Sequence, residues 1–201
     1  GPIIGMSTMF TQINNATISL DRFDEIMKEV PIVSDTNVSL PILSFNEIEF
    51  KNVTFKYPFD EKAVIRGINF KITKGQTIGI VGPTGAGKST LIRQLLREFN
   101  VSDGNILVDG KDISTYKIDD IRNLVGYVPQ AHTIFKKDVT ANIKMGKPKA
   151  SQDQLDKAVR IADFEKDLPF LDQGLGTMVG ESGSTLSGGQ KQRLSIARAL
   201  I

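Results

Sequence analysis

The chain has 201 residues, a formal net charge of +2 and no cysteine. This length allows one well-packed domain with an appendage. The lack of cysteine excludes disulfides, thiol chemistry and cysteine-based metal sites. The near-neutral charge gives no electrostatic reason to expect a nucleic-acid partner. Residues 1–20 carry no charge but are rich in Ser, Thr, Asn and Gln, so we expect that they do not span a membrane by themselves.

An amphipathic helix is predicted near the N-terminus. Apolar residues recur there mostly three or four positions apart, at Ile13, Ala16, Leu20, Phe23, Ile26 and Val30. Pro, Ser, Asp, Thr and Asn residues between positions 31 and 41 then predict a linker. We therefore place a domain boundary near residue 44.

Short strands are predicted after the linker. Residues 45–57 alternate between apolar and polar side chains, which is typical of a half-buried strand. The apolar run 77–81 predicts a strand that leads directly into a glycine-rich loop and then into an apolar helical segment, 91–99. Further strands are predicted at 67–72, at 106–108 before an Asp109-Gly110 turn, and at 125–128.

The rest of the chain has a helical pattern. Ser151 and Gln154 form a predicted capping box at the start of a helix that continues to about residue 162. Residues 164–171 predict a short helix, and a last helix begins at about Ser187. Strands first, helices later and a strand–loop–helix unit between them predict an α/β fold with a helical insert.

The clearest chemical motif is a loop of the form GxxxxGK[ST] between a predicted strand and a predicted helix. Its glycines let backbone N–H groups point at an anion, and the start of the helix adds a positive dipole. Lys88 supplies a charge for the β and γ phosphates, and the Ser89 hydroxyl is a suitable oxygen ligand for Mg²⁺. We therefore predict a nucleotide site at Gly82, Pro83, Thr84, Gly85, Ala86, Gly87, Lys88, Ser89 and Thr90.

A second motif is the segment Leu186-Ser187-Gly188-Gly189-Gln190. Ser187 and Gln190 have the spacing of a capping box, so Ser187 is expected at the start of a helix. The two glycines expose backbone N–H groups, and the helix dipole favours an anion there. The segment is thus a second phosphate-facing surface, and one nucleotide can be held between two such surfaces.

Together the two motifs resemble those of the ATP-binding cassette (ABC) transporter family, in particular its exporters, and the resemblance covers the whole chain. It implies a P-loop NTPase (RecA-like) core with an antiparallel β subdomain and an α-helical subdomain that carries the signature motif. It also implies a dimer of two such domains, identical or different, with ATP at their interface. Ser187, Gly188, Gly189 and Gln190 are then expected to act on the partner's nucleotide.

The resemblance implies roles for further residues. Tyr57 matches the aromatic residue that stacks on adenine, and Gln130 matches the glutamine that reaches Mg²⁺ and takes part in catalysis with Lys88. Gln130 and Glu181 are expected to contact the coupling helices of the membrane domain, although Ser182 stands where the family usually has Arg. His132 is not the family's switch histidine, and we expect it to be a solvent-side loop residue.

The resemblance also implies a domain organisation. Residues 1–44 resemble the end of the last transmembrane helix with its cytoplasmic extension and linker. Residues 45–201 resemble an incomplete nucleotide-binding domain that lacks the Walker B motif and the later segments of the family's domain, including the catalytic Glu. The whole protein is expected to be a multi-pass protein of the cell (inner) membrane with this domain on the cytoplasmic face. The piece alone is expected to be inactive.

Three functions are compatible with the motifs. The leading hypothesis is an ATP-hydrolysing exporter subunit, in which ATP and Mg²⁺ drive dimerisation and transport. The alternative is a degenerate, non-hydrolysing ATP-binding partner in a heterodimeric transporter. The third, an ABC ATPase of DNA repair or translation, is disfavoured because only 55 residues, 131–185, separate Gln130 from Leu186. The transported substrate is not predicted.

Overall fold

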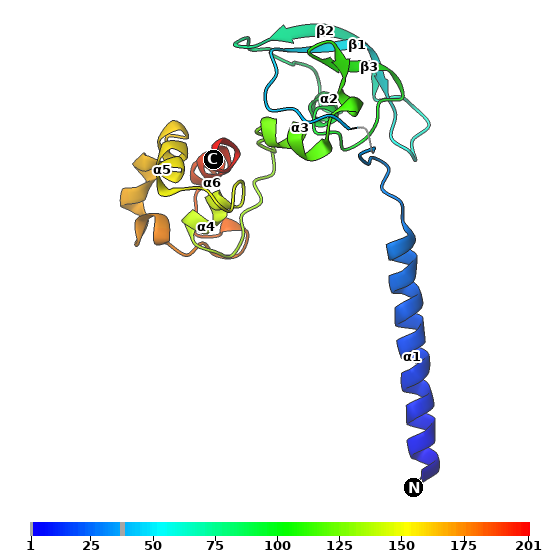
Figure 1. The fold of residues 1–201 in the computed structure, drawn as a ribbon. Coiled ribbons are helices and arrows are strands. Elements are labelled where there is room, and N and C mark those ends of the chain that lie inside the picture. The colour runs from blue at the N-terminus through cyan, green and yellow to red at the C-terminus, as the bar shows by residue number, and fades with distance from the viewer. Residues whose placement is uncertain (1, 37–38) are drawn as a thin grey trace. The chain divides into compact units, whose positions relative to one another are not determined.

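The computed structural model describes residues 2–36 and 39–201. The chain divides into two compact units, Gly1–Ile121 and Arg122–Ile201 (Figure 1). The first unit contains one long helix, a small sheet and two short helices, and the second is helical. Each unit has its own buried side chains, so each is described by itself.

The first unit begins with helix α1 (Pro2–Lys28). It starts earlier than the predicted segment, at a proline, which is compatible with the first turn of a helix because its missing N–H has no partner there in any case. Its apolar side chains are exposed, Ile13 by 53% and Leu20 by 63%. Within residues 2–36 and 39–201, no helix combines the length and apolar character needed to cross a membrane.

The linker after α1 is fixed to helix α3 (Ile118–Leu124) by two reciprocal hydrogen bonds. The Ile118 N–H donates to Asp35 Oδ1 at 2.9 Å, and the Ile42 N–H donates to Asp120 Oδ2 at 3.2 Å. Asp35 thereby satisfies one of the N–H groups that the first turn of a helix leaves open. The linker is therefore ordered where it passes α3.

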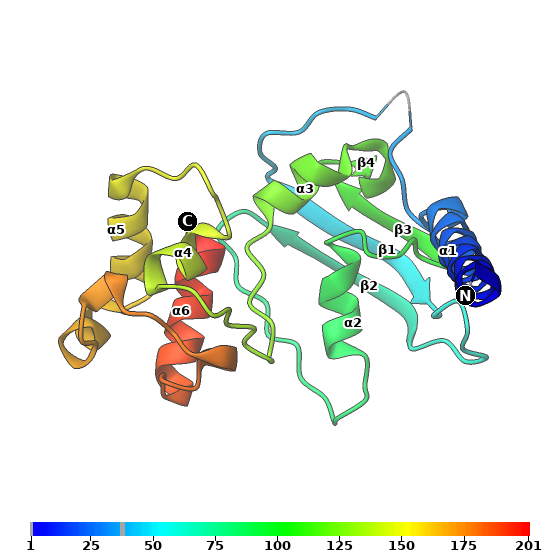
Figure 2. The ribbon, with the colours of Figure 1, turned by 90° about the horizontal axis from the view of Figure 1, so that it is seen from below.

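The sheet of the first unit is antiparallel, with strand order β2-β1-β3-β4 (Figure 2). The predicted strands at 45–57, 67–72 and 106–108 are confirmed. The apolar residues of the central strand alternate with polar ones and are buried, as a half-covered sheet requires. The strands are β1 (Glu47–Phe55), β2 (Ile65–Thr73), β3 (Asp103–Val108) and β4 (Lys111–Asp112).

The pairing of β1 with β3 is irregular near Gly104. The register shifts between Lys51 and Thr54, and Asn52 has a positive φ of 48°. Gly104 has a φ of +75°, and a Cβ atom there would lie 2.3 Å from the Asn52 carbonyl oxygen. Only glycine fits this close approach of two backbones.

The strands predicted at 77–81 and 125–128 are not formed, and this part of the prediction is wrong for the described residues. Both segments lack strand pairing, and Val81 is 96% exposed. A parallel strand needs a hydrogen-bonded neighbour and cover on both faces. Both runs are apolar, but neither finds a partner strand within residues 2–36 and 39–201. The predicted parallel part of the core is therefore absent from the part of the chain that the structure describes.

The second unit packs α6 (Gly188–Leu200) against α4 (Val139–Lys144) and α5 (Gln152–Ile161). Both predicted capping boxes are confirmed, at Ser151 and at Ser187. The helix predicted at 164–171 is instead the 3₁₀ helix η2 (Glu165–Phe170), since Pro169 removes a backbone donor inside it. The core of the unit consists of Ile134, Val139, Ile143, Leu155, Val159, Ala162, Phe164, Val179, Leu186, Leu194 and Ala197.

Candidate functional site

The glycine-rich loop folds around the ammonium group of Lys88. Lys88 Nζ donates to the carbonyl oxygens of Gly82 and Pro83, both at 2.8 Å. Helix α2 (Lys88–Gln94) begins directly after the loop, and its N-cap residue, Gly87, makes no side-chain capping bond. The loop thus places a cation beside a helix start that no side chain caps. Both features favour an anion.

Two glycines of the loop have conformations that other residues rarely adopt. Gly85 and Gly87 have φ values of 84° and 85°. At Gly87 the space is also restricted, because a Cβ atom would lie 3.0 Å from the Val64 carbonyl oxygen. The loop can therefore turn tightly into α2 only with glycine at these positions.

Tyr57 lies against the helix that comes after the loop. Its hydroxyl group is 3.1 Å from Thr90 Oγ1, and either oxygen can donate to the other. Its ring packs edge-on against Phe55 and Phe99, with centroids 4.9 and 5.3 Å away. The structure thus brings Tyr57 and the phosphate loop together, and Thr90 takes part by holding the tyrosine.

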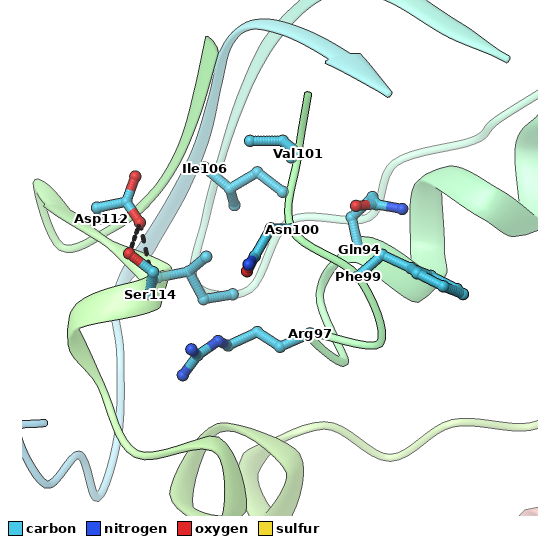
Figure 3. A pocket seen from close by; sticks show the side chains of 9 residues that line it. Gln94, Arg97, Phe99, Asn100, Val101, Ile106, Asp112 and Ser114 are labelled. Carbon is cyan, nitrogen blue, oxygen red and sulfur yellow. Dashed lines mark hydrogen bonds between the residues drawn. The ribbon is translucent and has the colours of Figure 1, made fainter. Parts of the chain in front are cut away.

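A cavity of about 250 Å³ lies at the C-terminal end of α2 (Figure 3). Gln94 and Asp112 line it, and Gln94 is buried, with no hydrogen bond to its Oε1 from the described residues. Burial opposes ionisation of Asp112, but hydrogen bonds from Ser114 and Asn105 lower its pKa below the ordinary 3.8. Sequence reasoning did not find this cavity, because no motif marks it.

The residues present fit a magnesium ion bound with a nucleotide. Within the described residues, no group of three or more His, Cys, Asp or Glu side chains could hold a metal ion by itself. Magnesium bound to a nucleotide takes most of its oxygen ligands from phosphates and water, so it needs few from the protein. The exposed hydroxyl of Ser89, in the first turn of α2, suits this arrangement.

Residues 186–190, called the signature segment from here on, lead into α6, whose start has a closed capping box. The Gln190 N–H donates to Ser187 Oγ at 3.3 Å, and the Ser187 N–H donates to Gln190 Oε1 at 2.8 Å. Gly188 and Gly189, between them, are exposed. The side chains of Ser187 and Gln190 therefore hold the helix start, and the glycine backbone is the part that faces solvent.

Gln130 is exposed, and the segment after it is packed against the loop that carries Glu181. The Val179 N–H donates to the Lys137 carbonyl oxygen at 3.0 Å. At Gly183, whose φ is +70°, a Cβ atom would lie 3.2 Å from Ile134. The structure therefore joins the two segments that sequence reasoning assigned to coupling.

His132 differs from expectation. It is half-buried, and its Nδ1 atom is buried without a hydrogen bond from any described residue. The prediction of a solvent-side loop residue is therefore wrong in part, because hydrogen bonds to its neighbours hold the segment close to the rest of the second unit.

The expected site residues thus form two groups. Tyr57 and the loop residues 82–90 lie in the first unit, whereas Gln130, Glu181 and the segment 187–190 lie in the second. Each group is fixed within its own unit. The structure also adds polar residues whose roles no motif marked, all in the second unit: Asn142, Asp167, Arg193 and Arg198.

Residues 65–201 match the family described as "ABC transporter". The chain is 41% identical over 200 residues to "Probable multidrug resistance ABC transporter ATP-binding/permease protein YheI" of Bacillus subtilis, covering 100% of this chain and 34% of that protein. It is 39% identical over 202 residues to "ATP-binding cassette sub-family B member 6" of Xenopus tropicalis, covering 100% of this chain and 24% of that protein.

A solved structure, "Structure of a bacterial Atm1-family ABC exporter with ATP bound", is similar with a TM-score of 0.85 and 35% sequence identity. The similarity covers 95% of this chain and 33% of that one. The chain therefore spans about a third of the length of YheI, at 34%, and less of the longer Xenopus relative.

Proposed function

Because this chain belongs to the ABC transporter family, we propose that it is the ATP-binding part of an exporter subunit that hydrolyses ATP to drive transport. The observation that carries the proposal is the loop of residues 82–88, in which Lys88 Nζ donates to the carbonyl oxygens of Gly82 and Pro83 beside the uncapped start of α2. An incoming phosphate competes with those carbonyl oxygens for the ammonium group. The loop therefore has a cation and backbone donors ready for a nucleotide.

The first unit binds the nucleotide in this proposal. Lys88 and the loop N–H groups hold the phosphates, and Tyr57 stacks on adenine, held in place by Thr90. Ser89 and Gln130 are the residues that would hold Mg²⁺. The ion, when bound, neutralises phosphate charge.

The start of α6 contacts the nucleotide of a second copy or of a related subunit. Its exposed glycines, Gly188 and Gly189, offer backbone N–H groups at the positive end of a 13-residue helix. The closed capping box supports this role of the glycine backbone, because the side chains of Ser187 and Gln190 are already used to hold the start of the helix. ATP would then join two subunits, and hydrolysis would separate them.

The exposed residues Gln130 and Glu181 transmit this closure to the membrane domain. The packing of the segment after Gln130 against the loop of Glu181 supports a single coupling surface. In the proposed organisation, residues 1–44 are the end of the membrane domain with its linker, and residues 45–201 are the nucleotide-binding domain. The whole protein lies in the cell membrane with this domain on its cytoplasmic face.

The test uses the whole protein, purified in lipid nanodiscs, with MgATP binding and phosphate release as readouts. We expect Lys88→Ala to lower the rate of ATP hydrolysis by about 100-fold or more. The matched control is Lys74→Ala, because Lys74 is an exposed lysine of the same unit outside the loop. It should leave the rate unchanged.

Two other outcomes have a clear meaning. A protein that neither binds nor hydrolyses MgATP would refute the proposal. Binding that depends on Lys88, without hydrolysis, would indicate the non-hydrolysing partner of a heterodimeric transporter instead.

A further inference from the structure

We propose that the ion pair between Asp167 and Arg193 positions the glycine-rich start of α6 for the phosphates of the partner's nucleotide. The inference rests on the proposed function, because it concerns the segment that is proposed to contact that nucleotide. Asp167 lies outside every motif of the sequence, and Arg193 lies after the signature segment 186–190. Both are positioning residues, which act through Gly189.

The ion pair is bidentate and largely buried. Arg193 Nε donates to Asp167 Oδ2 at 2.6 Å, and Arg193 Nη2 donates to Asp167 Oδ1 at 2.7 Å. The Asp167 side chain is 7% exposed and the Arg193 side chain is 25% exposed. Two parallel charge-assisted hydrogen bonds fix the direction of the guanidinium as well as its distance. The pair therefore holds the guanidinium plane in one orientation.

The guanidinium held in this way lies beside the backbone of Gly189. Arg193 is one helical turn after Gly189, and its side chain points back toward the start of α6. A Cβ atom at Gly189 would lie 3.3 Å from Arg193 Nη1 and 3.6 Å from Nη2. The guanidinium of Arg193 occupies space that a side chain at position 189 would fill. The position of the guanidinium therefore affects the position of the Gly189 backbone.

The other end of the ion pair is anchored in the core of the second unit. Asp167 lies in η2, and its N–H donates to the Phe164 carbonyl oxygen at 3.0 Å. Phe164 is fully buried. A continuous series of contacts therefore runs from the core through Asp167 and Arg193 to Gly189.

Capping of α6 does not explain this arrangement. Ser187 and Gln190 already complete the capping box, and a positive charge near the start of a helix opposes the helix dipole. Asp167 offsets this charge while keeping the guanidinium beside Gly189. Arg193 thus lies where its charge disfavours the isolated helix. This is consistent with a role in orienting the backbone of Gly189.

The test measures the ATP dependence of hydrolysis by the whole protein in nanodiscs, giving kcat and KM separately. We expect Asp167→Asn to lower kcat by about 10- to 100-fold, because a small misplacement of a contacting group has effects of that size. Binding of a fluorescent ATP analogue to the P-loop in the absence of Mg²⁺ should be unchanged. Nucleotide-dependent association of the two ATP-binding units, measured by crosslinking, should weaken in parallel with kcat.

The matched control is Asp163→Asn. Asp163 lies four residues before Asp167 and forms an ion pair with Lys166. The side chains of Asp163 and Lys166 are both more than half exposed. This variant should behave like the unsubstituted protein, since exposed ion pairs contribute little. Arg193→Lys keeps the charge but not the two-pronged geometry, so it should resemble Asp167→Asn. The double variant Asp167→Asn/Arg193→Gln should be no worse than either single variant.

Two results would overturn the proposal while leaving the proposed function intact. One is an active protein in which Asp167→Asn and Asp163→Asn have the same kcat. The other is a loss of kcat that only tracks the loss of folded protein, with the remaining folded fraction fully active. If the unsubstituted protein neither binds nor hydrolyses MgATP, the proposed function fails and the inference is withdrawn with it.

Discussion

Asn142 of α4 is the residue whose replacement tests most directly how the segment after Gln130 is held. Its side chain is fully buried. Asn142 Oδ1 accepts from the Phe135 N–H at 3.0 Å, and Nδ2 lies 2.9 Å from the Phe135 carbonyl oxygen. Nδ2 also lies 3.2 and 3.1 Å from the carbonyl oxygens of Lys137 and Asp138. One amide therefore bonds to four backbone groups of this turn.

The change Asn142→Leu nearly preserves volume but removes both the donor and the acceptor. The three carbonyl oxygens keep backbone donors, the N–H groups of Lys137, Val179 and Asn142. The Phe135 N–H, however, then loses its acceptor in a partly buried place. An unsatisfied group of this kind costs about 1–3 kcal/mol. We therefore expect local opening of residues 131–138 to become easier by about 2 kcal/mol, or about 30-fold in the opening constant.

The change Asn142→Asp separates hydrogen bonding from charge. The carboxylate keeps the acceptor for the Phe135 N–H and for Arg198, whose Nη2 is 3.1 Å from Asn142 Oδ1. Its second oxygen, however, would face the three carbonyl oxygens that now accept from Nδ2. Because a buried carboxylate oxygen that faces only acceptors is costly, we expect this variant to open as readily as Asn142→Leu, in spite of the neighbouring arginine.

Hydrogen exchange of the whole protein, measured by mass spectrometry, reports this opening for peptides that cover residues 131–138. The control is Gln152→Leu, which removes an exposed hydrogen bond from Gln152 Nε2 to Asp156 on α5. It should leave exchange in 131–138 unchanged. Unchanged exchange in Asn142→Leu would refute the view that one side chain holds the segment. Slower exchange in Asn142→Asp would show that pairing with Arg198 dominates.

Three further outcomes are expected from particular contacts. Gly104→Ala should destabilise the pairing of β1 with β3 by about 3 kcal/mol, because its φ is +75° and its Cβ would meet the Asn52 carbonyl; faster amide exchange in both strands is the check. Ser187→Ala should weaken the start of α6 by about 1 kcal/mol, measured as faster exchange of the Gln190 amide. The lowered pKa of Asp112 contributes stability that is present above pH 3.8 and is lost as the pH falls through the lowered value. Asp112→Asn should remove that acid-dependent loss from an acid titration of the unfolding temperature.

Elements whose signals are local were predicted well from the sequence. The capping boxes at Ser151 and Ser187 depend on residues three positions apart, and both are formed. The antiparallel strands follow alternation that each strand carries by itself. The phosphate loop was recognised for the same reason, since its glycines and Lys88 lie within one short segment.

Features that depend on distant residues could not be predicted in this way. A segment such as 77–81 becomes a strand only when another strand pairs with it, and the pattern of its own residues does not reveal that partner. Arg193 and Asp167 are 26 residues apart, and Arg198 and Asn142 are 56 apart. Neither pair has a periodic pattern or a spacing that marks it. Their roles appear only when the helices of the second unit pack together.

The two glycine-rich helix starts differ in a way that separates the roles of side chain and backbone. At α2 the N-cap residue is a glycine, Gly87, so no side chain caps the start of the helix. A phosphate that binds there displaces only the contacts of Lys88 with the loop carbonyls. At α6 the side chains of Ser187 and Gln190 are already bonded to backbone N–H groups. A ligand at α6 therefore gains most from the exposed glycine backbone, because using either side chain would first break the cap. Substitutions at Ser187 and Gln190 should thus act through the stability of the helix start, whereas those that move Gly189 should act through the contact itself.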